Sequence, residues 1–288
     1  MNRIRMHHHT LRALWQVDSY EDYHGLLFGQ ALEAYLARVE REGGEAGSVL
    51  AVGACWREAQ ILVRFPFERI VLSSVAEPDE AVERACDADS RVVFEHANAE
   101  HLPFASRSFD LVFTKESLHH LARPVLGLYE MLRVCRRAAV FVEPWDCALV
   151  RLLDRAGIAT RYERGQQSNL RARDNFVYRW NVRQLQSLLS SLYLESGYTL
   201  DVRTGWMSVR AQVRQPRFLR RLSALAGFAA SCLPGARGNL ATVLVAPGAD
   251  RPPDPLPERP RPAASVGSEG RAADARAAGC RAPRHPSP

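Results

Sequence analysis

The chain has 288 residues, 47% of them hydrophobic, so it can bury a core and form one large domain or two smaller ones. This composition excludes a wholly disordered chain. The net charge of +6 is unevenly spread, because residues 1–150 carry 15 arginines and Lys115 against 22 acidic residues, whereas residues 151–240 carry 15 arginines against 5. An acidic region is followed by a basic one.

Cysteine usage and apolar runs restrict the class further. The six cysteines lie far apart without a CxxC pair, which argues against a disulfide scaffold or a zinc module. No apolar run approaches the roughly 20 residues that span a bilayer, and no signal peptide is evident. We therefore expect a cytoplasmic protein without a metal site.

Helical and strand patterns alternate along the first half of the chain. Residues 1–44 are predicted to form an N-terminal helical segment. Five short apolar strands follow, with helical patterns between them, at residues 48–53, 69–74, 91–96, 109–114 and 138–143. Such alternation predicts a parallel sheet covered by helices on both faces, with ligands bound at the carboxyl ends of its strands.

After the fifth strand the pattern changes. Residues 147–248 are rich in arginine and predict a basic cap or insert, an amphipathic helix at Val182 to Leu192, and two closing strands at 199–208 and 239–246. Residues 249–288 hold 9 of the 17 prolines and almost no large apolar residues. This last segment is predicted to be a disordered tail.

Three sequence blocks occur in a recognisable order. They are NAEHLPF at residues 98–104, SFDLVF at 108–113 and LHHL at 118–121, followed by YEMLRV at 129–134 and VEP at 142–144. Together they resemble the small-molecule branch of the class I S-adenosylmethionine-dependent methyltransferases. The resemblance covers residues 45–146. It implies a Rossmann-like α/β fold with a mostly parallel seven-stranded sheet, helices on both faces and a helical cap.

The resemblance also implies S-adenosylmethionine as cofactor, and the family's three cofactor elements can be compared with this chain. The glycine-rich turn keeps only Gly53, the acidic residue that ends the second strand is replaced by Ser73-Ser74, and the Asp-Ala pair is Asn98-Ala99. The cofactor contacts that the resemblance assigns are Gly53, Ala54, Ser73, Asn98, Ala99 and Lys115. Gly53 could instead form an ordinary turn, Asn98 an Asx-turn, and Lys115 a solvated rim.

Energetic estimates show how much these departures matter. Losing a charged hydrogen bond to the ribose costs about 1.5–3 kcal/mol. A side chain at a glycine position with positive φ costs about 1–3 kcal/mol. Together these losses would weaken cofactor binding by roughly 10²- to 10⁴-fold.

Candidate chemistry follows the fourth strand, where His119 and His120 could deprotonate an acceptor hydroxyl. The alternative is that both histidines form hydrogen bonds at a helix start. Arginines and aromatic residues alternate in residues 160–180, where they could bind an anionic or aromatic substrate or form a solvated loop. The substrate candidates are Arg171, Arg173, Tyr178 and Arg179.

The leading hypothesis is therefore methyl transfer from S-adenosylmethionine to a small-molecule acceptor. The alternative is a non-catalytic methyltransferase-like scaffold or partner subunit that has lost cofactor binding. We do not expect nucleic-acid binding, because no continuous basic stripe is present. The segment from Arg217 to Leu233 could rest on an anionic membrane, although packing against the domain is the favoured interpretation. The sequence leaves the oligomeric state open.

Overall fold

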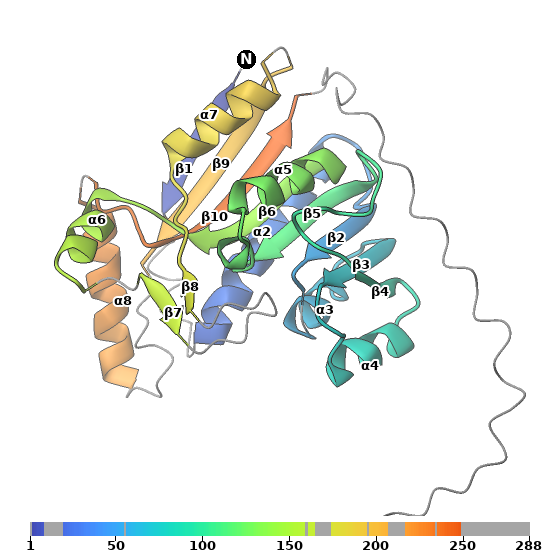
Figure 1. Cartoon of the computed structure of the whole chain (residues 1–288), viewed down its shortest axis with the longest axis horizontal. Helices are drawn as coiled ribbons and strands as arrows, with labels where there is room; N and C mark the ends of the chain where they lie inside the picture. The colour runs from blue at the N-terminus through green and yellow to red at the C-terminus, as the bar shows by residue number, and fades with distance from the viewer. Residues whose placement is uncertain are drawn as a thin grey trace, which may run out of the picture.

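A central sheet organises the molecule (Figure 1). A computed structural model describes residues 2–8, 20–54, 56–158, 161–164, 174–194, 196–206, 217–233 and 235–248. Across the sheet the strand order is β1 (Arg3–His8), β9 (Tyr198–Gly205), β10 (Leu240–Pro247), β6 (Cys135–Pro144), β5 (Phe109–Lys115), β2 (Ser48–Val52), β3 (Arg69–Ser74) and β4 (Val92–His96). The predicted tail at 249–288 lies outside the described residues.

The strand directions confirm the predicted fold class. Within the eight-stranded sheet, β10 runs antiparallel to both of its neighbours, β6 and β9, and the other pairs are parallel. Strand order reverses between β2 and β5, because the chain first builds outward to β4 and then returns to pair β5 with β2. Ligands of open α/β sheets bind at such a switch point.

The sheet has one strand more than the seven predicted. Strand β1 pairs in parallel with β9, with Arg3 opposite Thr199. It falls in the segment predicted to be helical, where helix α2 (Tyr20–Arg41) does form. The pairing partner is distant in the chain, so a local pattern gives no signal for this strand.

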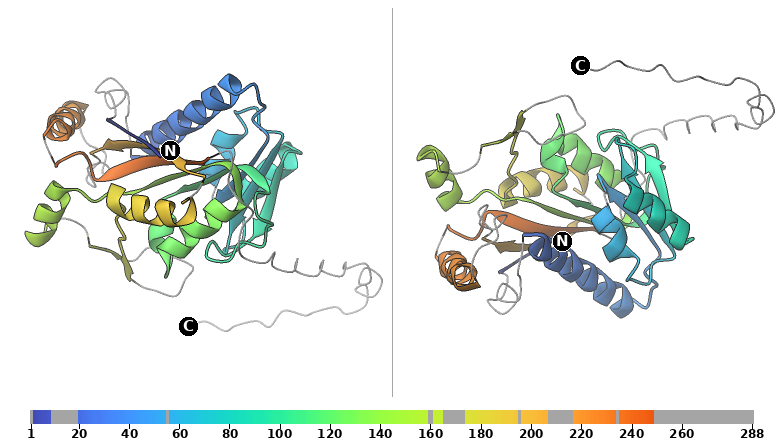
Figure 2. Two further views of the ribbon diagram at one scale, coloured as in Figure 1. Left: turned by 90° about the horizontal axis from the view of Figure 1, so that it is seen from above. Right: turned by 90° about the horizontal axis from the view of Figure 1, so that it is seen from below.

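Helices cover both faces of the sheet (Figure 2). One face packs against α2, α3 (Trp56–Leu62) and α4 (Glu80–Ala88). The other packs against the short 3₁₀ helix η1 (Leu118–His120), α5 (Pro124–Val134) and α7 (Val182–Leu192). Strand β2 is buried on both sides, with alternate residues in the two cores, which explains its continuous apolar run.

The cap elements gather at one end of the sheet. They are α6 (Ala148–Arg155), α8 (Arg217–Ser231) and the hairpin of β7 (Tyr162–Arg164) with β8 (Asp174–Phe176). Helix α6 follows the carboxyl end of β6, and α8 lies between the carboxyl end of β9 and the start of β10. In Figures 1 and 2 both helices lie at the end where the parallel strands finish.

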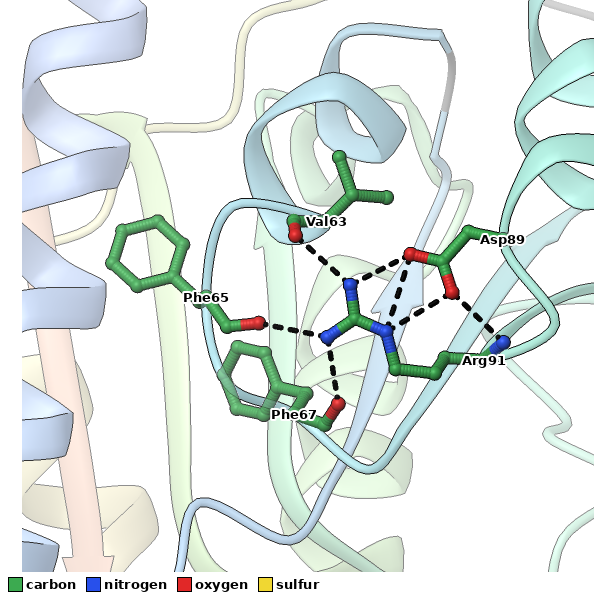
Figure 3. Close-up of polar contacts among 5 residues, drawn as sticks. All are labelled: Val63, Phe65, Phe67, Asp89 and Arg91. Carbon is green, nitrogen blue, oxygen red and sulfur yellow. Dashed lines mark hydrogen bonds and ion pairs between the residues drawn. The ribbon is translucent and has the colours of Figure 1, made fainter.

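Arg91 ties two loops together at the opposite edge (Figure 3). Its guanidinium donates hydrogen bonds of 3.0–3.1 Å to the backbone carbonyls of Val63, Phe65 and Phe67. It also pairs with Asp89, with 2.6 Å between Nη2 and Oδ2. The hydrogen bonds that Arg91 donates to Asp89 hold the pKa of Asp89 below its ordinary value of 3.8.

A buried ion pair explains why the sequence blocks at 98–104 and 129–134 occur together. Glu130 is fully buried and accepts a 2.9 Å hydrogen bond from the Leu102 N–H. Arg133 binds both oxygens of Glu130 and donates to the carbonyls of Leu102 and Phe104. The second block therefore holds the first against α5, and its charged residues are structural.

Candidate functional site

The turn after β2 meets the turn after β5 at the switch point. Gly53 has φ +66°, a conformation that favours glycine. The Ser117 hydroxyl lies 3.3 Å from the carbonyl oxygen of Gly53 and 3.0 Å from that of Lys115. A Cβ atom on Gly53 would lie 2.5 Å from the Ser117 Oγ. Both backbone conformation and Ser117 therefore require glycine here.

A buried carboxylate organises the turn that carries the two histidines. Glu143 lies near the end of β6 and is 0% exposed. Its Oε1 accepts 2.8 Å hydrogen bonds from the N–H groups of Ser117 and Leu118, and its Oε2 accepts a 3.3 Å bond from that of His119. The carboxylate therefore fixes η1 to the end of the neighbouring strand.

The same carboxylate contacts the His119 side chain, whose Nδ1 lies 2.7 Å from Glu143 Oε2. Both side chains are almost completely buried. An ionised carboxylate only accepts hydrogen bonds, so Nδ1 carries the proton in this pair and Nε2 keeps a lone pair when the imidazole is neutral. The His120 ring lies beside His119, with 4.2 Å between the ring centroids. The structure thus brings both predicted histidines to the switch point.

Lys115 points toward α3. Its Nζ lies 3.5 Å from Glu58 Oε1, and the two side chains are only 12% and 5% exposed. The interpretation of Lys115 as a solvated rim residue is therefore wrong. The pair joins the end of β5 to α3, the helix after the Gly53 turn. It therefore places two charges of opposite sign beside the switch point.

The other residues assigned to the cofactor lie at the same edge but differ in exposure. Ser73 is fully buried and donates a 3.1 Å hydrogen bond to the Ala51 carbonyl, so the structure does not bring its hydroxyl to the surface. Ala54 is buried and donates its N–H to the Ser73 carbonyl at 2.9 Å. The predicted ribose contact through Ser73 therefore has no exposed polar group.

Asn98 and Ala99 follow β4. The exposed Asn98 side chain accepts a 2.9 Å hydrogen bond from the Glu100 N–H, which forms the Asx-turn that was its alternative interpretation. Ala99 is 8% exposed. An Asx-turn uses only the side-chain oxygen, so the amide nitrogen keeps its own donor capacity.

The predicted substrate residues divide into two groups. Arg171 and Arg173 lie outside the described residues. Tyr178 and Arg179 precede Trp180. The backbone N–H of Trp180 donates a 2.9 Å hydrogen bond to the Pro144 carbonyl at the end of β6. The Tyr178 ring lies 5.0 Å from the Trp180 ring, and burial raises the pKa of Tyr178 above its usual value. The structure therefore brings Tyr178 and Arg179 beside the end of β6.

Three residues at the site were not predicted from sequence. Glu58 and Glu143 each approach a predicted residue, and a glutamate ending an apolar strand was the available signal for Glu143. Trp180 is 1% exposed, and its indole Nε1 has no hydrogen-bond partner within the described parts of the chain. A buried donor of this kind requires an acceptor.

The site can be compared with the needs of an adenosyl cofactor. The left-handed turn at Gly53 is exposed at the switch point, and Asn98 is exposed after β4, so the turns after β2 and β4 both offer groups to a ligand. Because no carboxylate ends β3 and Ser73 is sealed, the ribose lacks its usual partner. The residues present fit the cofactor at these two turns and not at the third.

Neither a metal-binding cluster nor a helix able to cross a membrane is present among the described residues. No group of three or more His, Cys, Asp or Glu side chains in this part of the chain is arranged to hold a metal ion. Among the described helices, none combines the length and the apolar character needed to cross a bilayer.

Comparison with known proteins shows a similarity over part of the chain. Residues 54–142 match the family model described as "Methyltransferase domain". A stretch of 81 residues is 36% identical to the 27-O-demethylrifamycin SV methyltransferase of Amycolatopsis mediterranei. That stretch covers 26% of this chain and 27% of the relative, so the match spans about a quarter of each protein.

Solved structures with the same general architecture are more distant. The YcgJ protein of Bacillus subtilis is 17% identical, with a TM-score of 0.47 over 76% of this chain and 98% of its own. The magnesium protoporphyrin IX methyltransferase of Synechocystis PCC 6803 is 11% identical, with a TM-score of 0.45 over 82% of this chain and 92% of its own.

Proposed function

We propose, from the premise that residues 54–142 belong to the methyltransferase domain family, that the chain transfers a methyl group from S-adenosylmethionine to a small-molecule acceptor. The observation that carries this proposal is the His119–Glu143 contact at the switch point. It supports a base held beside the place where α/β sheets bind their ligands. The cytoplasmic location expected from the sequence stays a prediction.

The turns after β2 and β4 hold the cofactor. When bound there, S-adenosylmethionine supplies an activated methyl group for attack by an acceptor atom. Gly53 would let the backbone approach the ligand closely, and Asn98 with Ala99 would hold the adenine. The Lys115–Glu58 pair holds the Gly53 turn and the end of β5 in fixed positions.

His119 acts on the acceptor. Its neutral imidazole takes the acceptor's proton at Nε2, while Glu143 keeps the other ring nitrogen protonated and stabilises the imidazolium that forms. Glu143 is a positioning residue, because it acts through His119. Since the His119 side chain is only 2% exposed, the acceptor reaches Nε2 only when it is bound inside the site, from which bulk water is then excluded.

The acceptor is an anionic or aromatic small molecule. Support comes from Tyr178 and Arg179 beside the end of β6, and from the Trp180 indole N–H, which requires an acceptor atom. Mass spectrometry of ligands that co-purify with the protein tests this class. An aromatic carboxylate or phosphate is the expected finding, and a purely aliphatic cation would contradict it.

Calorimetry with S-adenosylhomocysteine tests cofactor binding. We expect binding weakened by the missing ribose carboxylate, and a further loss of about tenfold in Asn98→Ala if the amide contacts adenine. His96→Ala, at an exposed residue two positions earlier in the chain, is the matched control and should bind like the wild type.

Kinetics test the proposed base and its positioning residue. His119→Gln should lower kcat by roughly 10²- to 10⁴-fold without changing cofactor affinity. Glu143→Gln should lower kcat and move the rising limb of the pH profile to lower pH, because the imidazolium loses its anionic partner. Glu95→Gln, an exposed glutamate on β4, should leave both the rate and the pH profile unchanged.

The second candidate is a non-catalytic methyltransferase-like scaffold or partner subunit. The burial of Ser73 favours it, since the ribose hydroxyls then find only the half-buried Ser74 and no carboxylate at the end of β3. Calorimetry separates the two functions. Absence of binding at millimolar S-adenosylmethionine would support the scaffold and reject the enzyme.

A further inference from the structure

Several large apolar side chains on and just after helix α8 are exposed. Phe218, Leu222, Leu225 and Leu233 are 72%, 52%, 41% and 58% exposed. At about 100° per residue the three within the helix share one side of it. We call these four side chains the α8 face. The sequence interpretation that this segment packs against the domain does not hold for these four side chains.

Small residues form the opposite side of the helix. A Cβ atom on Gly227 would lie 3.0 Å from the Trp206 Cβ, so this glycine lets the helix approach the end of β9 closely. Ser231 is buried and donates a 2.9 Å hydrogen bond to the Gly227 carbonyl. Helix α8 thus contacts the protein through Gly227 and Ser231 and leaves Phe218, Leu222 and Leu225 exposed. A contiguous exposed apolar surface of this kind marks an interaction site.

The charge around the α8 face specifies its partner. Residues 202–249 contain seven arginines and no acidic residue. Arg221 and Arg237 are exposed on and beside the helix. A surface that combines basic residues with leucine and phenylalanine is complementary to an anionic lipid bilayer. A second copy of the same basic surface would be repelled.

Neighbouring elements also leave large apolar side chains exposed. Leu152 on α6 is 60% exposed, and Ile158 just after that helix is 71% exposed. The Leu149 N–H donates to the Gly235 carbonyl at 3.3 Å, so α6 is joined to the turn that follows α8. Figures 1 and 2 show both helices at the same end of the molecule.

We propose that the α8 face docks the protein on an anionic membrane surface, with its apolar side chains inserted at the interface and the surrounding arginines near lipid phosphates. This surface lies at the carboxyl edge of the sheet, because α8 is anchored beside the end of β9. The candidate site at the end of β5 lies at that same edge. Docking does not depend on the proposed methyl transfer and can be measured without it.

Vesicle flotation of the full-length protein tests the proposal. One set of vesicles contains phosphatidylglycerol and phosphatidylcholine in equal parts, and the other contains phosphatidylcholine alone. We expect flotation with the anionic vesicles, weaker flotation with the neutral ones, and a loss of binding as salt concentration rises. Failure to float with anionic vesicles, or equal flotation with both sets, overturns the proposal.

A matched pair of variants assigns the binding to the α8 face. Leu222→Glu should reduce partitioning onto anionic vesicles by roughly tenfold or more, because an inserted leucine is replaced by a charge. Leu194→Glu makes the same change at a leucine that is 84% exposed after α7, and should leave partitioning unchanged. Equal binding by the two variants contradicts the proposal.

Sedimentation velocity tests whether the α8 face binds a second copy of the chain instead. If the wild-type protein does not float but forms a dimer, and Leu222→Glu dissociates that dimer, the α8 face binds a second copy. Membrane docking is then rejected. A wild-type protein that floats and stays monomeric without lipid supports docking. Circular dichroism of both variants verifies folding, which exposed substitutions should leave intact.

Discussion

The core at residues 45–146 and the basic segment at 147–248 use charge in opposite ways. In the core, Arg133 and Glu130 form a pair that is 8% and 0% exposed and holds a neighbouring segment in place. In the basic segment, Arg161 pairs with Asp154 where the side chains are 53% and 29% exposed. In these two pairs the core charges are buried and hold a neighbouring segment, whereas the charges of the basic segment lie at the surface.

Apolar residues differ in the same sense. Strands β2, β3, β5 and β6 of the core are largely buried, whereas the basic segment leaves Leu152, Ile158 and Phe218 exposed beside its own buried strands β9 and β10. The contrast therefore lies between buried pairs such as Arg133–Glu130 and the exposed side chains of α6 and α8. Four substitutions test this contrast.

The largest expected loss follows from breaking the buried pair. Arg133→Met should lower the free energy of unfolding by about 3–5 kcal/mol, because it leaves the Glu130 carboxylate buried without a counter-charge. Urea denaturation measures it. Arg84→Met, in a pair with Glu80 that is largely exposed, should cost less than about 0.5 kcal/mol. Similar losses in both variants would contradict the contrast.

The turn at Gly53 comes next. Gly53→Ala should cost about 1–3 kcal/mol, since alanine is strained at φ +66° and its Cβ would meet Ser117. Gly29→Ala on α2, where nothing lies within 4 Å, should instead stabilise by about 0.5–1 kcal/mol. Adding Ser117→Gly to Gly53→Ala should recover the steric part of the loss, and a double variant no more stable than the single would show that only the backbone matters.

The Arg91 contacts give a smaller effect with a pH signature. Arg91→Lys should cost about 1–2 kcal/mol at neutral pH, because an ammonium cannot reproduce the hydrogen bonds to three carbonyls and Asp89. Since the Asp89 pKa is lowered in the folded state, its stabilising contribution is present above pH 3.8 and is lost as the pH falls through the folded-state pKa.

Thermal melting from neutral to acidic pH checks this signature. The difference between the wild type and Arg91→Lys should narrow at acidic pH. Arg38→Lys, which alters a surface pair with Glu42, should show a difference that stays near zero throughout. A gap that widens at low pH would reverse the assigned sign.

The smallest effect is expected in the basic segment. Arg151→Ser removes a pair with Asp146 in which the arginine is 56% exposed, and should change the free energy of unfolding by less than about 0.5 kcal/mol. Urea denaturation measures this change beside Arg133→Met. A loss of several kcal/mol would show that the surface charges stabilise the fold as the core charges do.

The sequence by itself determined the alternation of strands and helices, the approximate positions of β2 to β6 and the segment that carries His119 and His120. Hydrophobic periodicity reports which face of an element is buried, and the family blocks fix the order of elements. Neither names a partner distant in the chain. For that reason strand β1 was predicted to be helical, and the role of Glu143 was missed.

Only the tertiary structure decided which groups meet at the site. It brought Glu143 to His119, sealed Ser73 against Ala51 and turned Lys115 toward Glu58. It also showed that the amphipathic pattern of α8 faces outward. The pattern alone could not decide this, because an apolar stripe is equally compatible with a core and with a surface that another phase covers. Contacts between distant segments carry that information, and they exist only in the folded chain.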